Sequence, residues 1–392
     1  MTAQVAILNR SAVALASDSA VTIRGDKLNI YQTVNKLFAV SKYEPVGIMV
    51  YGGAELMGVP WESSIKLFRK ALGTKRCKRL IDYSDAFVEF LESNRILFPS
   101  SMQDHVDQYQ SRMLSDAVAE AVIAMAKEKI ESGETISDEE TVAAGEDVID
   151  ALFVAWSNHP RLDCFAEADE AKLLQRYGPL IEEVTKDVLG QLSLPASALD
   201  MLWRAIVMTF TRNRFLSSTG IVLAGFGEEE VFPAIDELLI EFVVGDRLKF
   251  RRSTRSVAER GAMIVPLAQR KMVDAFLQGI HPDYGSFLDS YLQKVFGEYH
   301  AGLTEGIDGI TDSVKTDIAV RIESAGKALL EDLHRAREVY SREKHVAAKV
   351  DTIQVLPKQE LAEMAEALVN LTSFEQRLSG SAETVGGQST SL

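Results

Sequence analysis

Short runs of apolar residues separated by polar or glycine-containing turns occupy the first seventy positions of the chain. Residues 3–8 and 12–16 are two such runs on either side of a polar turn, and together they predict a buried β-hairpin. Residues 45–51 form another apolar run, which ends at Gly52-Gly53, a break in the strand pattern. After residue 60 the apolar positions take helical spacing, so we expect strands first and then a helix.

Helical periodicity dominates residues 80–215, and strand-like patterns return after it. The later expected elements are strands at 220–226, 238–244 and 248–251, a helix at 266–277 that ends at Gly279, helices over 284–349, a strand at 350–355, a helix at 357–371 and a flexible end at 380–392. The pattern therefore predicts strand-containing segments on both sides of a long helical stretch, which is typical of the α+β class.

Composition removes several classes of function. The formal net charge of −15 argues against nucleic-acid binding, because phosphate contacts need clustered Lys and Arg. The two cysteines, Cys77 and Cys164, form neither a disulfide framework nor a zinc motif, which favours a reducing compartment. Residues 5–16 resemble the apolar part of a signal peptide but lack a preceding basic region, and no run approaches the roughly 20 apolar residues of a membrane helix. We therefore expect a cytoplasmic protein with no membrane partner.

Thr2 lies directly behind the initiator Met1. Removal of methionine before such a small residue would leave a chain that starts with Thr. A terminal threonine carries a hydroxyl nucleophile and a base in one residue, because the α-amine has a reference pKa of about 7.7–8.0 and is partly neutral at physiological pH. Thr2 is therefore a candidate catalytic nucleophile.

Three later features could serve that nucleophile. Asp18 follows the second apolar run, Lys36 is a lone cation in a strand-like segment, and Gly52 follows the third run. A hairpin would return Asp18 to the chain start, Lys36 would need an anion such as Asp18, and the Gly52 N–H could face an oxyanion. Each also has an ordinary interpretation, as a turn cap, a lysine that extends its amine to solvent, and a tight turn.

These residues, in this order, resemble the proteasome β-type subunits and related bacterial peptidase subunits. In that family the mature chain starts with Thr, an Asp ends the second strand, a Lys follows in a Thr-Val-x-Lys context, and Gly-Gly-Ala follows the next strand. The corresponding residues here are Thr2, Asp18, Lys36 within Thr33-Val34-Asn35-Lys36, and Gly52 within Gly52-Gly53-Ala54. The resemblance covers about half of the chain.

The later part of the chain is similar to the family more loosely. Residues 221–233 look like the mid-chain hairpin, and residues 360–371 followed by 384–387 look like the late helix and its Ser-Gly-Gly turn. The family's Asp and Ser in that turn are replaced, with Glu383 and Thr384 as auxiliary candidates. Family members continue into a core strand where this chain ends, so the resemblance implies that the strand is missing or that another segment takes its place.

The resemblance implies an Ntn (N-terminal nucleophile) fold, a four-layer αββα sandwich with large helical insertions. The expected segments are 1–75 and 216–283 as the two parts of the Ntn-like core, 76–215 as a helical insertion, 284–349 as a helical segment, 350–379 as a late core strand and helix, and 380–392 as a flexible tail.

The implied activity is hydrolysis of amide bonds by a threonine peptidase that uses mature Thr2 and needs no metal or organic cofactor. The implied partners are a peptide or protein substrate, further copies of the chain in a homo-oligomer that could form a ring, and an ATPase. The alternative is a catalytically inactive Ntn-fold scaffold or assembly protein, in which the helical insertions bind partners.

Overall fold

The computed structural model describes residues 3–18, 21–24, 28–31, 35–41, 43–305, 312–378 and 390–391. The chain divides into two compact units. The first unit contains Met1–Leu37, Glu230–Ala234 and Ser256–Leu392, and the second contains Phe38–Glu229 and Ile235–Arg255. Each unit combines a β-sheet with helices, so the α+β class is confirmed.

A four-stranded sheet in the order β12-β1-β2-β13 forms the centre of the first unit. Its strands are β1 (Gln4–Asn9), β2 (Val13–Ser17), β12 (Ala262–Ala268) and β13 (Thr390–Ser391). Val5 pairs with Ala16 in antiparallel register, so the predicted hairpin is confirmed. A separate two-stranded ribbon pairs β3 (Val21–Arg24) with β4 (Leu28–Tyr31).

One of the predictions for this unit is wrong in part and another is wrong. The helix expected at 266–277 begins only at α7 (Lys271–Gln278), because Pro266 pairs with Val5 in β12. Proline is tolerated there because β12 is the outer strand of its sheet. The end of α7 at Gly279, with φ of 79°, is confirmed.

The strand expected at 350–355 is instead part of a helix, α10 (Ala347–Gln354). Val350 and Ile353 are three positions apart and share one helical face, and Ile353 is buried in the core of the first unit. The side chain of Asn9 donates hydrogen bonds to the carbonyls of Ile353 (3.0 Å) and Leu356 (2.9 Å), which satisfies the end of this helix.

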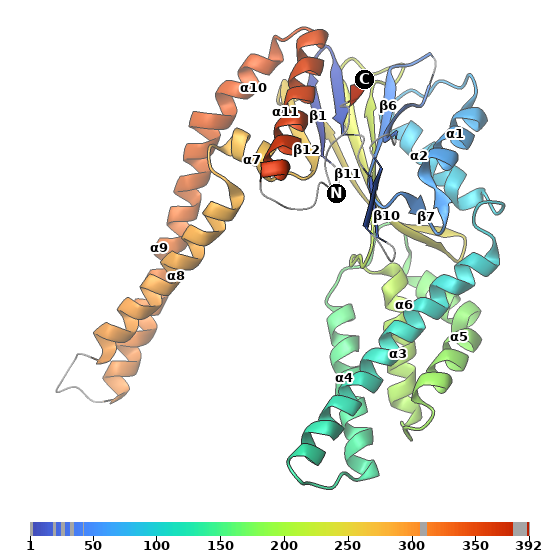
Figure 1. Cartoon of the computed structure of the whole chain (residues 1–392), viewed down its shortest axis with the longest axis vertical. Helices are drawn as coiled ribbons and strands as arrows, with labels where there is room; N and C mark the ends of the chain where they lie inside the picture. Colours follow the sequence, from blue (N-terminus) through green and yellow to red (C-terminus); the bar gives the residue numbers. More distant parts are fainter. Residues whose placement is uncertain are drawn as a thin grey trace. The chain divides into compact units, whose positions relative to one another are not determined.

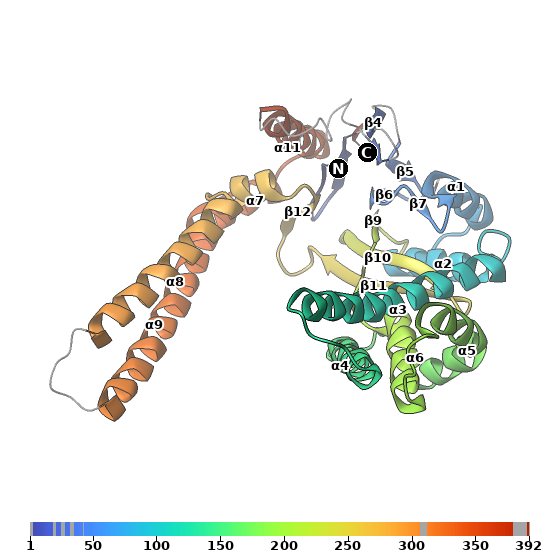
Figure 2. The ribbon, with the colours of Figure 1, turned by 60° about the horizontal axis from the view of Figure 1, so that its bottom comes forward.

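Helices complete the first unit. They are α8 (Pro282–Glu305), α9 (Asp312–Ser341), the π-helical turn η1 (Arg342–Val346), α10 and α11 (Lys358–Leu378). The helix expected at 357–371 is thus confirmed, and α11 packs on β1 and β2. Figure 2 shows α8 and α9 side by side.

Strand β1 is buried on both of its faces. Val5 and Ile7 point into the core beneath α11, while Ala6 and Leu8 alternate with them and are equally inaccessible. Successive side chains of a strand point to opposite faces. Apolar layers therefore cover both sides of this strand.

The second unit contains a five-stranded sheet in the order β11-β10-β9-β6-β5. Its strands are β5 (Leu37–Ala39), β6 (Val46–Gly52), β9 (Thr219–Gly225), β10 (Ala234–Val244) and β11 (Arg247–Ser256). The strands expected at 45–51, 220–226, 238–244 and 248–251 are confirmed. Gly245 and Asp246 join β10 to β11 with φ of 59° and 62°, the backbone that a two-residue hairpin turn requires. A small ribbon pairs β7 (Glu55–Leu56) with β8 (Val59–Pro60).

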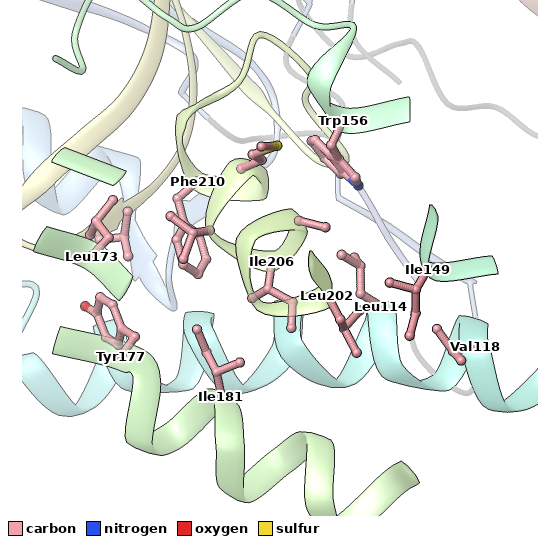
Figure 3. Close-up of a cluster of buried hydrophobic side chains, with 14 of the residues drawn as sticks. Leu114, Val118, Ile149, Trp156, Leu173, Tyr177, Ile181, Leu202, Ile206 and Phe210 are labelled. Carbon is pink, nitrogen blue, oxygen red and sulfur yellow. The ribbon is translucent and has the colours of Figure 1, made fainter. Parts of the chain in front are cut away.

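The helices of the second unit confirm the helical character expected of residues 80–215. They are α1 (Trp61–Leu72), α2 (Leu80–Ser93), α3 (Ser100–Glu131), α4 (Asp138–Ser157), α5 (Glu167–Leu189) and α6 (Ala196–Thr211). Figure 3 shows side chains of α3 to α6 converging on one apolar core that includes Trp156, Tyr177 and Phe210. None of the helices in the described ranges is long and apolar enough to cross a membrane.

Candidate functional site

Asp18 and Lys36 form a buried ion pair in the first unit. Asp18 directly follows the last residue of β2, and the Nζ of Lys36 lies 2.9 Å from its Oδ1. The Lys36 side chain is 6% exposed and the Asp18 side chain 1%. The predicted pairing of these two side chains is therefore present, with almost no solvent screening between the charges.

The hairpin places this pair against the start of the chain. The backbone N–H of Ala3 donates to Oδ1 of Asp18 at 3.1 Å, and the N–H of Asp18 donates to the Ala3 carbonyl at 3.1 Å. One carboxylate oxygen therefore touches both the Lys36 ammonium and the residue that follows Thr2. Thr2 itself lies outside the described residues.

Burial changes the acid–base behaviour of Lys36. Loss of hydration lowers the pKa of its ammonium below the ordinary value, and the charge and hydrogen bond of Asp18 offset only part of that effect. A buried ammonium of lowered pKa gives up its proton more readily than an exposed lysine does. The pair can therefore supply a positive charge and can take part in proton transfer.

Two further polar residues at this site were missed from the sequence. Gln4 and Ser17 are cross-strand partners in β1 and β2. The Gln4 amide donates to Ser17 Oγ at 3.0 Å, and that hydroxyl donates to the Asp18 carbonyl at 2.9 Å. Both are buried. Their signal in the sequence is a polar residue near the start of the first apolar run and another directly after the second run, which the hairpin brings together beside Asp18.

The end of the chain also reaches β2. Thr390 pairs with Ser17 and Ser391 with Ala16 in antiparallel register. The sequence predicted that a core strand was missing or replaced at this point, and Thr390 and Ser391 extend the sheet here. The prediction of a flexible tail is therefore wrong at these two residues. Residues 380–389 lie outside the described part of the chain, and so do the auxiliary candidates Glu383 and Thr384.

A left-handed residue lies at the same end of this sheet. Gln269 has φ of 51° and follows Ala268, the β12 residue that pairs with Gln4. Its side-chain oxygen accepts a hydrogen bond from Gln376 of α11 at 2.7 Å. A non-glycine residue in this conformation is uncommon and often occurs at functional sites, so Gln269 and Gln376 join the candidate site as supporting residues.

Gly52 ends β6 in the second unit, where it pairs with Thr219. Its φ is 87°, and a Cβ at this position would lie 2.8 Å from the carbonyl oxygen of Ser218. Both observations explain why the position needs glycine. Its role as an oxyanion donor stays a prediction.

A second buried lysine, also missed from the sequence, has a different character. Lys249 donates to the carbonyls of Thr209 (2.7 Å) and Arg214 (2.8 Å) and pairs with Glu241 at 2.6 Å. Burial lowers the pKa of Lys249 as well. Because its three protons all have acceptors, Lys249 ties β11 to α6 and β10 and is a structural residue.

Comparison with known proteins adds no family assignment. The chain matches no protein-family model, and a search of curated proteins gives no match either.

Proposed function

We propose that the protein is an N-terminal-nucleophile amide hydrolase of the proteasome-like kind, with Thr2 as the first residue of the mature chain. The single observation that carries the proposal is the buried Asp18–Lys36 pair, whose carboxylate accepts a hydrogen bond from the backbone of Ala3. An ion pair one residue from a terminal threonine can tune both the α-amine and the hydroxyl of that threonine.

In the proposed reaction, Thr2 Oγ attacks the carbonyl carbon of a peptide while the α-amine of Thr2 accepts the hydroxyl proton. The charge of Lys36 lowers the pKa of that amine, and Asp18 holds the lysine in place. The Gly52 N–H would donate to the oxyanion of the tetrahedral intermediate, a contribution of about 3–4 kcal/mol in comparable sites. The protonated amine then gives its proton to the leaving nitrogen, and an ester forms. Water, deprotonated by the same amine, cleaves the ester and restores Thr2.

The proposed architecture is the four-layer sandwich in which two sheets stack between helical layers. Two observations support it. Side chains on both faces of β1 are buried, and all residues of β9 are buried as well, as expected of central strands covered on each side. The pairing of Thr390 with Ser17 also supports it, because it supplies a late strand beside the hairpin.

The partners in the proposal come from the family resemblance. They are a peptide or protein substrate, further copies of the chain, which could form a ring, and an ATPase that delivers substrate.

The test starts with the mass of the N-terminal peptide from protein isolated from its native source. We expect Met1 to be absent. Native protein should hydrolyse a fluorogenic peptide and react with a peptide epoxyketone, which requires both the hydroxyl and the free amine of a terminal threonine.

Thr2→Ala should abolish hydrolysis and labelling, whereas Thr2→Ser, the matched control, keeps the hydroxyl and amine and should retain measurable labelling. Retained Met1, or equal labelling of Thr2→Ala and the native protein, would refute the nucleophile. A folded protein with Met1 and no hydrolysis would instead favour the non-catalytic scaffold.

A further inference from the structure

Helices α8 and α9 of the first unit form a long antiparallel hairpin (Figure 1). The carboxylate of Asp289 in α8 accepts hydrogen bonds from both terminal nitrogens of Arg337 in α9, at 2.8 and 3.1 Å. Farther along, Gly326 of α9 lies against Phe296 of α8. These contacts fix which residues of the two helices lie at the same level.

An apolar stripe runs along each of these helices on the outside. On α8 it follows positions i, i+3, i+7 and i+11, and on α9 it follows i, i+4 and i+11, which is one helical face in each case. The exposed members are Tyr284 57%, Phe287 60%, Tyr291 54% and Val295 39% on α8, and Leu329 58%, Leu333 42% and Tyr340 60% on α9. We call these seven residues the hairpin face.

The two stripes lie on the same side of the hairpin. On α8, Tyr284 precedes Gly285, which lies beside Arg337, and Val295 precedes Phe296, which lies against Gly326. On α9, Leu333 precedes His334, which lies 3.8 Å from the Asp289 carboxylate of α8. One residue is a rotation of about 100° about the helix axis. Because the helices run in opposite directions, the same rotation turns both stripes towards one side.

The exposed apolar area of the hairpin face is large for a monomer. A whole aromatic side chain has about 200 Å² of surface, so the four aromatic residues expose roughly 450 Å², and the three aliphatic residues bring the total to roughly 600 Å². That is the upper end of what monomeric proteins leave exposed. Two such faces pressed together would bury roughly 1,200 Å², which reaches the lower range of specific interfaces.

We propose that the hairpin face binds the hairpin face of a second copy of this chain, so that two hairpins form a four-helix bundle with two-fold symmetry. The charged border favours a copy over a strongly charged partner, since it carries both signs in similar number. These border residues are Asp283, Glu298, Asp317 and Asp332, and Lys294, Arg321 and Arg335.

Sedimentation of the purified full-length chain over a range of micromolar concentrations tests this contact. The native chain should associate, and the double variant Phe287→Glu with Leu333→Glu should have half the native mass, because four buried carboxylates would oppose the contact. Both side chains are already exposed, so circular dichroism should show unchanged helix content. If this variant failed to fold, Tyr284→Lys with Leu329→Lys would provide the same test.

The matched control is Tyr109→Glu with Ile130→Glu, two residues of α3 that are each 66% exposed and lie outside the hairpin face. Its mass should equal that of the native chain. A native chain that remains a monomer, or a hairpin variant that is folded and keeps the native mass, would overturn the proposal. This result does not depend on catalysis. If other contacts also assembled the chain into a ring, loss of the hairpin contact would still halve the mass of the assembly.

Discussion

Asp107 gives the sharpest test of how burial controls ionisation in this protein. It lies on α3 in the second unit with 0% of its surface exposed. Neither of its carboxylate oxygens has a hydrogen-bond partner among the residues that the structure describes. Burial, followed by the charge of Asp104, raises the pKa of Asp107 from 3.8 to about 7. The folded state therefore holds a proton on Asp107 over a range in which the unfolded chain has lost it.

The sign of the pH effect follows from this difference. Below pH 3.8 Asp107 is protonated in both the folded and the unfolded state, so its ionisation costs the folded state nothing. As pH rises from 3.8 to about 7, the unfolded state binds fewer protons than the folded state, so the free energy of unfolding falls by about 1.4 kcal/mol for each pH unit. Multiplying the pKa difference by the free energy per pH unit gives an upper limit of about 4 kcal/mol for the loss in the free energy of unfolding by pH 8.

Asp107→Asn removes the charge and keeps the size of the side chain. We expect the variant to be less stable than the native chain near pH 4 by the cost of the buried amide, about 1–3 kcal/mol, and to be more stable than the native chain at pH 8 by about 1–3 kcal/mol. Urea unfolding monitored by tryptophan fluorescence measures this, since Trp156 and Trp203 lie in or against the core of the α3–α6 helices.

Asp116→Asn is the matched control. Asp116 lies on the same helix with 47% of its side chain exposed, and its replacement should bring no comparable gain in stability at pH 8. The reasoning would be refuted if Asp107→Asn were no more stable than the native chain at pH 8, or if its advantage were equal at pH 4 and pH 8.

Two further substitutions test packing and pairing by urea unfolding. Lys36→Met should lower stability by about 3–5 kcal/mol, since Asp18 would remain buried without its cation; a loss below 1 kcal/mol would contradict this. Gly220→Ala should lower stability by about 1–3 kcal/mol, because its Cβ would lie 2.0 Å from the Tyr51 ring. Its control is Gly178→Ala inside α5, where a Cβ meets nothing within 4 Å. Alanine gains about 1 kcal/mol over glycine within a helix, but Pro179 follows directly and disfavours a helical residue with a Cβ before it, so we expect a change well below that of Gly220→Ala. Similar effects at both glycines would refute the packing argument.

Local pattern was sufficient to predict much of the fold. The hairpin of β1 and β2 and the strand β9 are apolar runs bounded by polar or glycine-containing turns, and the helices α3 to α6 keep helical spacing over many residues, so these elements could be predicted from the sequence. Shorter segments were less certain. Pro266 was assigned to a helix because its place at the edge of a sheet depends on β1, far away in the chain. Residues 350–355 are six positions long, too few to distinguish a strand from a helical turn.

The candidate site was predictable where its members lie close in sequence. Asp18 and Lys36 are joined by a hairpin return and by opposite charge, and both signals are local. Gln269 and Gln376 are 107 positions apart in the sequence, and their contact depends on how α11 packs on the sheet. No local pattern in the sequence therefore predicts it. The pairing of Lys249 with Glu241 was missed for a related reason, since the acceptors of Lys249 come from two separate segments of the chain, the end of α6 with the residues after it and β10.

The two buried lysines differ in what lies next to each of them. Both ion pairs carry the desolvation cost of buried charge. Lys249 has a structural role that offsets this cost, because it joins strand β11 to the end of α6. At the start of the chain, backbone hydrogen bonds between Ala3 and Asp18 and along β1 and β2 also hold the hairpin. A buried ion pair one residue from a candidate nucleophile is the pattern expected where ionisation serves a reaction.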